Sequence, residues 1–239
     1  MGLRDGGLGC RMIMKKIKEL SIMKKYFPVI VFLLLGSLAI ATDFDTNISG
    51  AYSFSYFNEK VESTSTDIIS HGIDLKICTY VNDSNIGFFM NTGFYFPSTL
   101  TAEIGGMEFK TTRDDYNWAS IISLILGCTY KWDFENIVVY AAVGPHLAQT
   151  VITNDMVSVL GYSFGVGGDI GVRFFFSDLV FINVGSIVSY DFYKDISVDN
   201  GYAEINETGS YDYKSIRPYL GIGIRLNETI GKKKTINEE

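Results

Sequence analysis

A long, strictly alternating segment constrains this chain more than any other feature of its sequence. Between Tyr162 and Phe176, the even positions are almost all apolar, and the odd positions include three glycines, one acid, Asp169, and one base, Arg173. A period of two is typical of a β-strand whose two faces meet different surroundings. Strands of soluble sheets usually end after about five or six residues, so this run indicates an unusual kind of sheet.

The same pattern recurs along the chain and predicts eight strands. Their ranges are 46–57, 68–80, 85–97, 116–130, 136–149, 160–176, 179–193 and 214–226. Short connectors alternate with long, polar, acidic ones, which are 58–67, 97–115, 150–159 and 194–213. Short turns on one side and long loops on the other are typical of outer-membrane barrels. The predicted fold class is therefore all-β: a closed antiparallel up-and-down transmembrane β-barrel of eight strands.

A soluble eight-stranded barrel of the lipocalin type is the alternative, and its apolar face would point inward. The lumen of a barrel of this size is only just filled by side chains. The glycine-rich face fits inside, whereas the face of Phe, Tyr, Ile and Leu does not. Aromatic residues also cluster at the strand ends, as expected at two membrane interfaces. The predicted interfacial aromatics are Tyr56, Phe57, Phe94–Phe96, Tyr116 and Trp118 at the long-loop end, and Tyr80, Tyr130 and Trp132 at the other.

The N-terminal segment predicts export. Lys24 and Lys25 precede an apolar run that ends in Ala39-Ile40-Ala41, which is the order of regions in a cleaved signal peptide. An uncleaved anchor is the alternative, but the run 27–41 is shorter than the roughly 20 residues that span a membrane. The predicted location is the bacterial outer membrane, after export by a cleaved signal peptide. The predicted divisions are an upstream extension at 1–22, the signal peptide at 23–41, the barrel at 42–226 and a polar tail at 227–239.

Charge and cysteine content exclude two classes of function. The net charge is -7, and phosphate binding needs a basic surface, so nucleic acid is not expected as a partner. Three cysteines are too few for a disulfide scaffold. The expected partners are outer-membrane lipid, the outer-membrane assembly machinery and an unidentified ligand of the surface loops.

Together, the signal peptide, the eight amphipathic strands and the alternating connectors resemble the small eight-stranded outer-membrane families, such as the OmpA barrel, OmpX and OmpW. The resemblance covers residues 46–226. The last strand is also similar to the assembly signal of outer-membrane proteins, with Tyr219, Gly221, Ile224 and Leu226 at the matching positions. It departs from that signal because residues 227–239 follow, where a terminal aromatic residue would stand.

Charged residues on the predicted inner faces are the main candidate site. They are Asp74, Lys76, Asp169, Arg173, Asp191, Arg217 and Arg225. One interpretation is an ion pathway, and the other is a paired network that plugs the lumen. Buried charges must be matched and eight strands leave little room for water, which favours the plug. Asp169 and Arg173 are expected to find partners on neighbouring strands, among Asp191, Arg217 and Arg225.

Gly165→Ser is expected to cost less stability than an outward arginine substitution such as Val166→Arg, because residue 165 faces the lumen.

No catalytic, metal or cofactor site is predicted. His146 is expected to point inward and His71 outward, and neither stands in the His-x-Ser arrangement of lipid-modifying barrel enzymes. Cys78 and Cys128 are expected on opposite faces of separate strands. The predicted function is a non-enzymatic outer-membrane barrel that presents acidic surface loops. A narrow channel for small or hydrophobic solutes is the alternative implied by the resemblance to OmpW, and a barrel enzyme acting on lipid is a third.

Overall fold

The computed structural model describes residues 44–61, 64–81, 84–104, 106–155, 158–199 and 204–227. The predicted extension, the signal peptide and the tail beyond Asn227 lie outside these residues. A short 3-10 helix, η1, covers Arg113–Asp115, and no helix of the described ranges is long and apolar enough to cross a membrane. The strands are β1 (Phe44–Val61), β2 (Thr64–Val81), β3 (Ile86–Ile104), β4 (Met107–Thr112), β5 (Trp118–Phe134), β6 (Ile137–Thr153), β7 (Ser158–Phe175), β8 (Val180–Asp199) and β9 (Glu204–Asn227).

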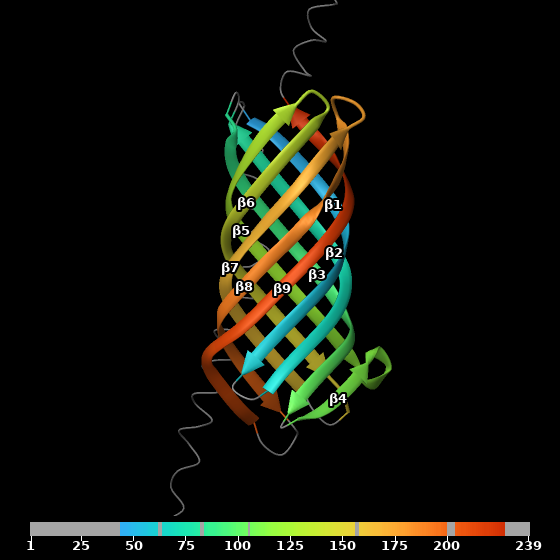
Figure 1. The fold of residues 1–239 in the computed structure, drawn as a ribbon, viewed down its shortest axis with the longest axis vertical. Coiled ribbons are helices and arrows are strands. Elements are labelled where there is room, and N and C mark those ends of the chain that lie inside the picture. Colours follow the sequence, from blue (N-terminus) through green and yellow to red (C-terminus); the bar gives the residue numbers. More distant parts are fainter. Residues whose placement is uncertain are drawn as a thin grey trace, which may run out of the picture. The chain divides into compact units, whose positions relative to one another are not determined.

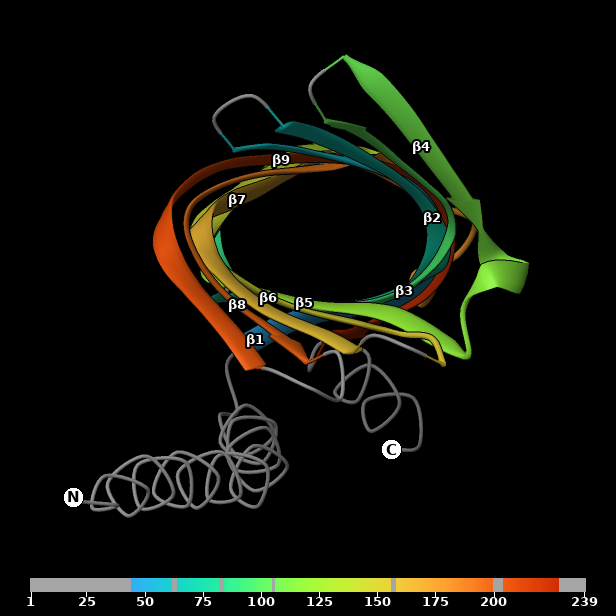
Figure 2. The same cartoon turned by 90° about the horizontal axis from the view of Figure 1, so that it is seen from below.

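Eight of these strands form one closed antiparallel ring. They follow the order β2-β1-β9-β8-β7-β6-β5-β3, and the pairing of β2 with β3 closes the ring. Figure 1 shows the barrel from the side, and Figure 2 shows the ring from below, with β4 projecting outside it. The prediction of an eight-stranded up-and-down barrel is therefore confirmed, with β4 as an additional strand paired to β3.

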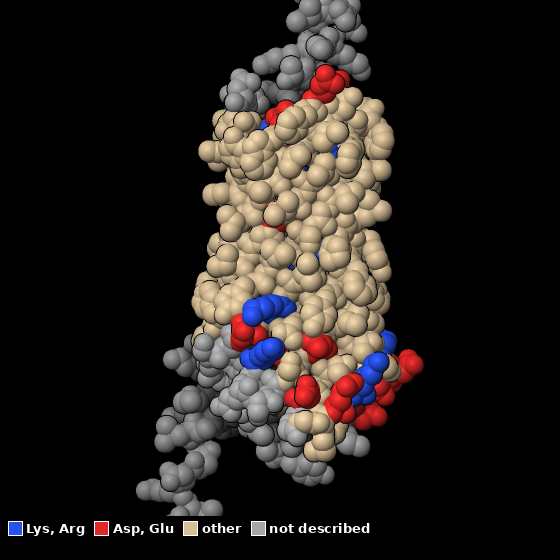
Figure 3. Space-filling view, viewed as in Figure 1, with Lys and Arg blue, Asp and Glu red and all other residues tan. Residues whose placement is uncertain are grey.

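The two faces of the wall separate as the alternation predicts. Asp74, Asp169 and Arg217 are buried inside the ring, whereas their neighbours along the strands point outward. Large apolar side chains cover the outside of the wall and form what we call the apolar belt, and Figure 3 shows this uncharged body on one face. Members of the belt include Tyr52, Phe54, Ile73, Leu75, Phe94, Val143, Leu147, Phe164, Val166, Ile170, Leu220 and Ile222.

The strands are longer than predicted, and the predicted long loops are mostly wrong. Segments 58–67, 97–115, 150–159 and 194–213 continue the ladders for most of their length, for example where Lys60 pairs with Ser65 and Ala102 with Phe109. The barrel strands have 17 to 24 residues, against the roughly ten that cross a membrane. The outer face becomes polar where the apolar belt ends, and this polarity resembles that of a loop although the backbone remains a strand.

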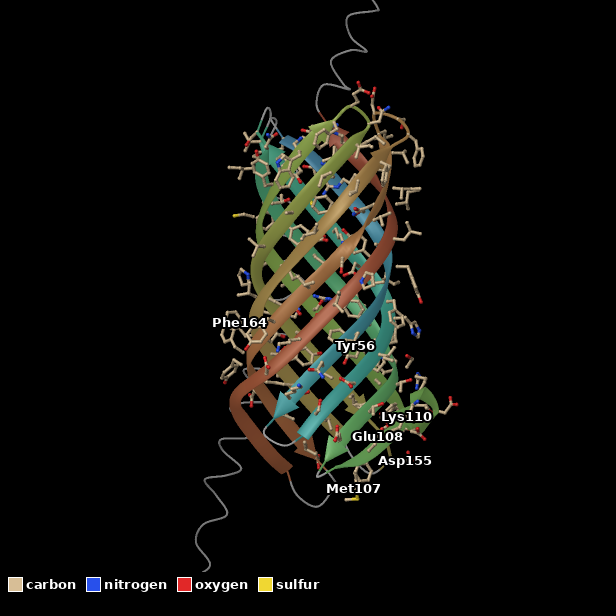
Figure 4. All side chains as sticks on the ribbon, in the orientation of Figure 1. Tyr56, Met107, Glu108, Lys110, Asp155 and Phe164 are labelled. Atoms are coloured by element: carbon tan, nitrogen blue, oxygen red, sulfur yellow. The ribbon has the colours of Figure 1, made fainter. Side chains whose placement is uncertain are left out.

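The polarity of the two faces reverses at the end of the barrel that carries the β3–β4 hairpin, which we call the hairpin end. On β1, Phe54 and Tyr56 point outward before this end is reached, and Lys60 points outward within it. On the inner face, Phe57 and Ile68 replace the serines and charges found further from the hairpin end. Charged side chains gather at the hairpin end in Figure 3, and Figure 4 labels Glu108, Lys110 and Asp155 there, beyond the level of Tyr56 and Phe164.

Several aromatic residues expected at the membrane interfaces lie inside the barrel instead. Phe57, Tyr80 and Tyr95 have no exposed surface, because their positions fall on the inner side of the alternation. The outward pairs Tyr130–Trp132 and Phe96–Trp118, with ring centroids 4.7 Å and 6.5 Å apart, occupy the two ends of the wall as predicted.

Gly165 lies at a bulge between β7 and β8, where the register shifts between Phe164 and Gly165. A Cβ atom at this position would overlap the carbonyl oxygen of Tyr190 and the carboxylate of Asp191. The expectation that Gly165→Ser is mild is therefore wrong, because the backbone of β8 approaches too closely for any side chain.

The apolar belt predicts a strong dependence of stability on position along the outer face. We expect Val166→Arg and Ile222→Arg each to lower the free energy of unfolding by about 2–4 kcal/mol, because an outward arginine near the middle of the belt would lie in lipid. Thr101→Arg, on the polar outer face of the hairpin end, is the matched control and should cost less than about 1 kcal/mol. Urea unfolding in lipid vesicles measures all three, and equal costs would contradict a lipid-facing belt.

Candidate functional site

The packed interior of the barrel is the candidate site, and a salt bridge across the lumen lies within it. Lys76 Nζ on β2 is 2.9 Å from Asp169 Oδ2 on β7, and both side chains are almost fully buried. These strands stand on opposite sides of the ring, so the pair spans the lumen. Tyr140 and Tyr219 also donate their hydroxyls to Asp169, at 3.1 Å and 2.9 Å. The carboxylate therefore has several partners, as a buried charge requires.

Asp74 and Arg217 form a second polar group nearer the hairpin end. Asp74 accepts hydrogen bonds from Ser53, from Asn91 Nδ2 at 3.0 Å and from the Tyr95 hydroxyl at 2.6 Å. Arg217 Nη1 donates to the same Tyr95 hydroxyl at 3.1 Å and to Ser123 Oγ at 2.6 Å. Tyr95 thus links the carboxylate of Asp74 to the guanidinium of Arg217.

Arg173 occupies the lumen on the side of the central salt bridge that faces away from the hairpin end. Its Nη2 lies 2.7 Å from Cys78 Sγ, and its Nη1 lies 3.5 Å from the Tyr80 hydroxyl. The guanidinium also stacks on the ring of Tyr140, 4.1 Å from the centroid. Cys78 is buried and Cys128 exposed, and both are free thiols.

The short-turn end, opposite the hairpin end, is closed by a third ionic group. Asp45 accepts two hydrogen bonds from Arg225, at 2.9 Å and 2.8 Å, and one from Lys131 Nζ at 3.0 Å. Lys131 also lies 3.2 Å from Asp133, which is half exposed. Arg225 is only partly buried, so it lies at this end of the lumen and not within it.

His146 and Asp191 make a buried pair with Ser163, but the arrangement is not that of a catalytic triad. His146 Nδ1 is 2.6 Å from Asp191 Oδ1, and Ser163 Oγ donates to the other carboxylate oxygen at 2.6 Å. In a triad the serine would bond to the free ring nitrogen of the histidine. No described side chain bonds to His146 Nε2. His71 lies on the outer face, as predicted.

Aromatic rings close the lumen towards the hairpin end. The ring of Phe57 stacks on Tyr213 at 5.7 Å and meets the edge of Tyr95 at 5.8 Å. Ile68 and Ile121 complete this buried cluster, which we call the aromatic stopper. Closer still to the hairpin end, Lys194 Nζ lies 2.5 Å from the carboxylate of Glu59.

The structure brings the predicted lumen residues together, but not in the predicted pairs. Asp169 pairs with Lys76, and Arg173 contacts Cys78 and Tyr80; neither bonds to Asp191, Arg217 or Arg225. The prediction failed because long side chains reach across the ring, where sequence spacing carries no information. Sequence reasoning also missed Asp45 and Lys131, although both follow the alternation that marks inner positions.

The residues of the proposed assembly signal divide between the two faces. Tyr219 is buried inside, where its hydroxyl lies 2.6 Å from that of Tyr140, and Gly221 shares this side of the strand. Ile224 and Leu226 are exposed on the outer face. Recognition of these four residues by the assembly machinery remains a prediction, whereas Tyr219 also belongs to the packed interior.

Comparisons with solved structures return barrels of the same architecture. OprG, an outer membrane protein of Pseudomonas aeruginosa, superposes with a TM-score of 0.51 at 12% identity, over 77% of this chain and 96% of OprG. The chain has the fold of a small outer-membrane β-barrel. Neisserial surface protein A gives a TM-score of 0.49 at 12% identity, over 77% of this chain and 97% of that one. A major outer membrane protein of Thermus thermophilus gives 0.47 at 14% identity, over 74% and 99%. No family model matches the sequence, and no curated protein matches it significantly.

The central salt bridge predicts a large penalty when one partner is removed. We expect Asp169→Ala to lower the free energy of unfolding by about 3–5 kcal/mol, because Lys76 would remain as an uncompensated buried charge. Replacing both partners, as Lys76→Met with Asp169→Leu, should recover much of this loss.

Asp133→Ala provides the control, because it removes a carboxylate from a half-exposed pair and should cost less than about 1 kcal/mol. Urea unfolding of the refolded barrels gives the three values. An Asp169→Ala cost as small as that of Asp133→Ala would show that the interior is hydrated.

Proposed function

We propose that the protein is a non-enzymatic, integral barrel of the bacterial outer membrane, with a closed lumen and a polar surface presented at the hairpin end. The apolar belt supports insertion, since soluble proteins do not leave so many large apolar side chains exposed on one continuous wall. The fold shared with OprG supports the outer membrane as the location. Export by the signal peptide at 23–41 is part of this proposal.

The packed interior is the observation that carries the closed lumen. Three ionic or polar groups follow one another from the short-turn end towards the hairpin end. They are built around Asp45, Lys76–Asp169 and Asp74–Arg217, and the aromatic stopper follows them. Each group contains a side chain that crosses from one side of the ring to the other. An ion would have to displace these contacts in succession, so the interior supports a plug and not a pathway.

The outer face at the hairpin end supports a surface-interaction role. The described charged residues on its strands are mainly acidic: Asp67, Glu103, Glu108, Asp195, Asp199 and Asp212 against Lys60, Lys110 and Lys214. The connections add Asp114, Asp115 and Asp155 against Arg113. Most of them lie on strands and not on long loops, so much of the surface is held by β-ladders. A rigid, acidic surface of this kind suits a cationic partner better than an anionic one.

The closed lumen predicts that the unmutated protein does not conduct. In planar lipid bilayers, we expect no current steps above those of the bare membrane. Replacing the three long inner side chains together, as Lys76→Ala, Arg173→Ala and Arg217→Ala, should open a measurable conductance in barrels that still fold.

The matched control replaces three outward bases, as Lys60→Ala, Lys110→Ala and Lys214→Ala, and should leave the membrane silent. Stepwise conductance of the unmutated protein would reject the plug and favour the ion pathway.

A second candidate function is the binding of small hydrophobic solutes at the hairpin end, and the reversed polarity there favours it. Beyond the aromatic stopper, towards the hairpin end, the inner face carries the Glu59–Lys194 ion pair and then apolar residues, which include Ile152, Val159, Ile196 and Val198. Met107 and Phe109 continue this face onto the hairpin and are 64% and 52% exposed. An apolar surface inside a polar rim is a usual form of a site for an apolar ligand.

This second candidate predicts specific binding of an apolar probe. A naphthalene-type fluorophore should bind to the protein in vesicles and lose most of its affinity in Phe109→Asp, which places a charge on the apolar face. Lys110→Asp adds negative charge on the opposite face of the same strand and should leave binding unchanged. Equal binding by both variants would exclude the hairpin end as the site.

A further inference from the structure

Arg217 is completely buried but bonds through only one of its three nitrogens. Nη1 donates to Tyr95 and Ser123, whereas Nε and Nη2 have no acceptor among the described side chains. Within the described ranges, no carboxylate forms a salt bridge with Arg217. Asp74 reaches it only through the Tyr95 hydroxyl, because the oxygens of Asp74 already accept from Ser53, Asn91 and Tyr95. A buried guanidinium with free N–H groups is costly unless something accepts from it.

Two serines complete a row of hydrogen-bond donors beside Arg217. Ser55 on β1 pairs in register with Ser70 on β2. Across β1 and β9, Tyr56 pairs with Ile216 and Ser53 with Tyr219, a register that places Ser55 level with Arg217. Both serine hydroxyls are fully buried and have no partner among the described residues. Three adjacent strands therefore present unused O–H and N–H groups in one inner row.

The surroundings limit what such a row can bind. Phe57 and Ile68 of the aromatic stopper lie next to the row on the side of the hairpin end, one inner position away on β1 and β2. On the side of the short-turn end, Ser53 donates a hydrogen bond to Asp74, and Tyr219 donates one to Asp169. The ligand must be small, because rings close one side and bonded groups close the other. It must also accept hydrogen bonds, and the N–H groups of a guanidinium bond most strongly to an acceptor that carries negative charge.

We propose that Arg217, Ser55 and Ser70 bind a small monovalent anion, with the size and charge of chloride, inside the barrel. Arg217 supplies the positive charge together with Nε–H and Nη2–H, and the two serines supply O–H donors. A halide accepts hydrogen bonds from the charged guanidinium more strongly than neutral water does, so it binds better than solvent. The site goes beyond the proposed function, because it depends only on the interior and neither on conduction nor on a ligand at the hairpin end.

Halide-dependent stability of the refolded full barrel tests this site. Urea unfolding is measured at constant ionic strength while sodium gluconate is replaced stepwise by sodium chloride or sodium bromide. A bound halide should raise the midpoint in a saturable way, since a ligand that binds only the folded state stabilises it according to its occupancy. Gluconate is too large for the site and serves as the reference anion.

Variants then locate the effect. The double variant Ser55→Ala with Ser70→Ala removes two small hydroxyls without adding bulk. It should weaken bromide binding about a hundredfold, because each lost hydrogen bond to a charged group costs about tenfold. Arg217→Lys should weaken it at least as much, because lysine lacks the Nε–H and Nη2–H donors. Arg225→Lys at the short-turn end is the matched control and should retain the full halide effect.

Crystals grown in bromide give a direct test of the position. An anomalous peak beside Arg217 in the unmutated protein, absent from the double serine variant, would support the site. Water alone at that position, or a halide effect that is unchanged in the serine variant, would overturn it.

Discussion

Alternation of side chains along a strand couples the two surfaces of this barrel. Every residue that faces the apolar belt forces its neighbour into a lumen that eight strands make narrow. The polar half of the sequence must therefore be satisfied inside, without bulk water. The salt bridge of Lys76 with Asp169, the hydroxyls of Tyr95, Tyr140 and Tyr219, and the Asp45 group at the short-turn end meet this requirement by reaching across the ring. The packed interior is thus a consequence of the outer face.

The same alternation continues past the apolar belt with its polarity reversed. On β1 the change falls between Tyr56, which belongs to the belt, and Lys60, which faces outward among polar groups, while Phe57 closes the lumen. Nearer the hairpin end, the outer face is mainly polar, and the inner face is largely apolar apart from the Glu59–Lys194 ion pair. The protein therefore carries two kinds of β-structure on continuous strands, and the hairpin end is held firmly enough to present a defined surface.

Much of the fold could be predicted because it depends on a period of two. That period placed Asp74, Lys76, Asp169 and Arg217 on the inner face, and the structure agrees. The strand ends could not be predicted, since polar outer residues beyond the belt look like loop residues. The partners of Asp169 and Arg173 could not be predicted either, because contacts across the ring depend on its closure and stagger. The bulge that makes Gly165 necessary leaves no signal in one sequence beyond the glycine itself.

The reversal of polarity along one strand is the central claim, and spin-label accessibility tests it directly. Nitroxides are attached one at a time from Tyr52 to Lys60, in refolded barrels that carry Cys128→Ser and sit in lipid vesicles. The account predicts that labels at 52, 54 and 56 are accessible to oxygen dissolved in the lipid, and that the label at 60 is accessible to a water-soluble nickel complex. Labels at 53 and 55 should be protected from both. Access of the nickel complex to positions 52, 54 and 56 would contradict the account, because the belt would then face water.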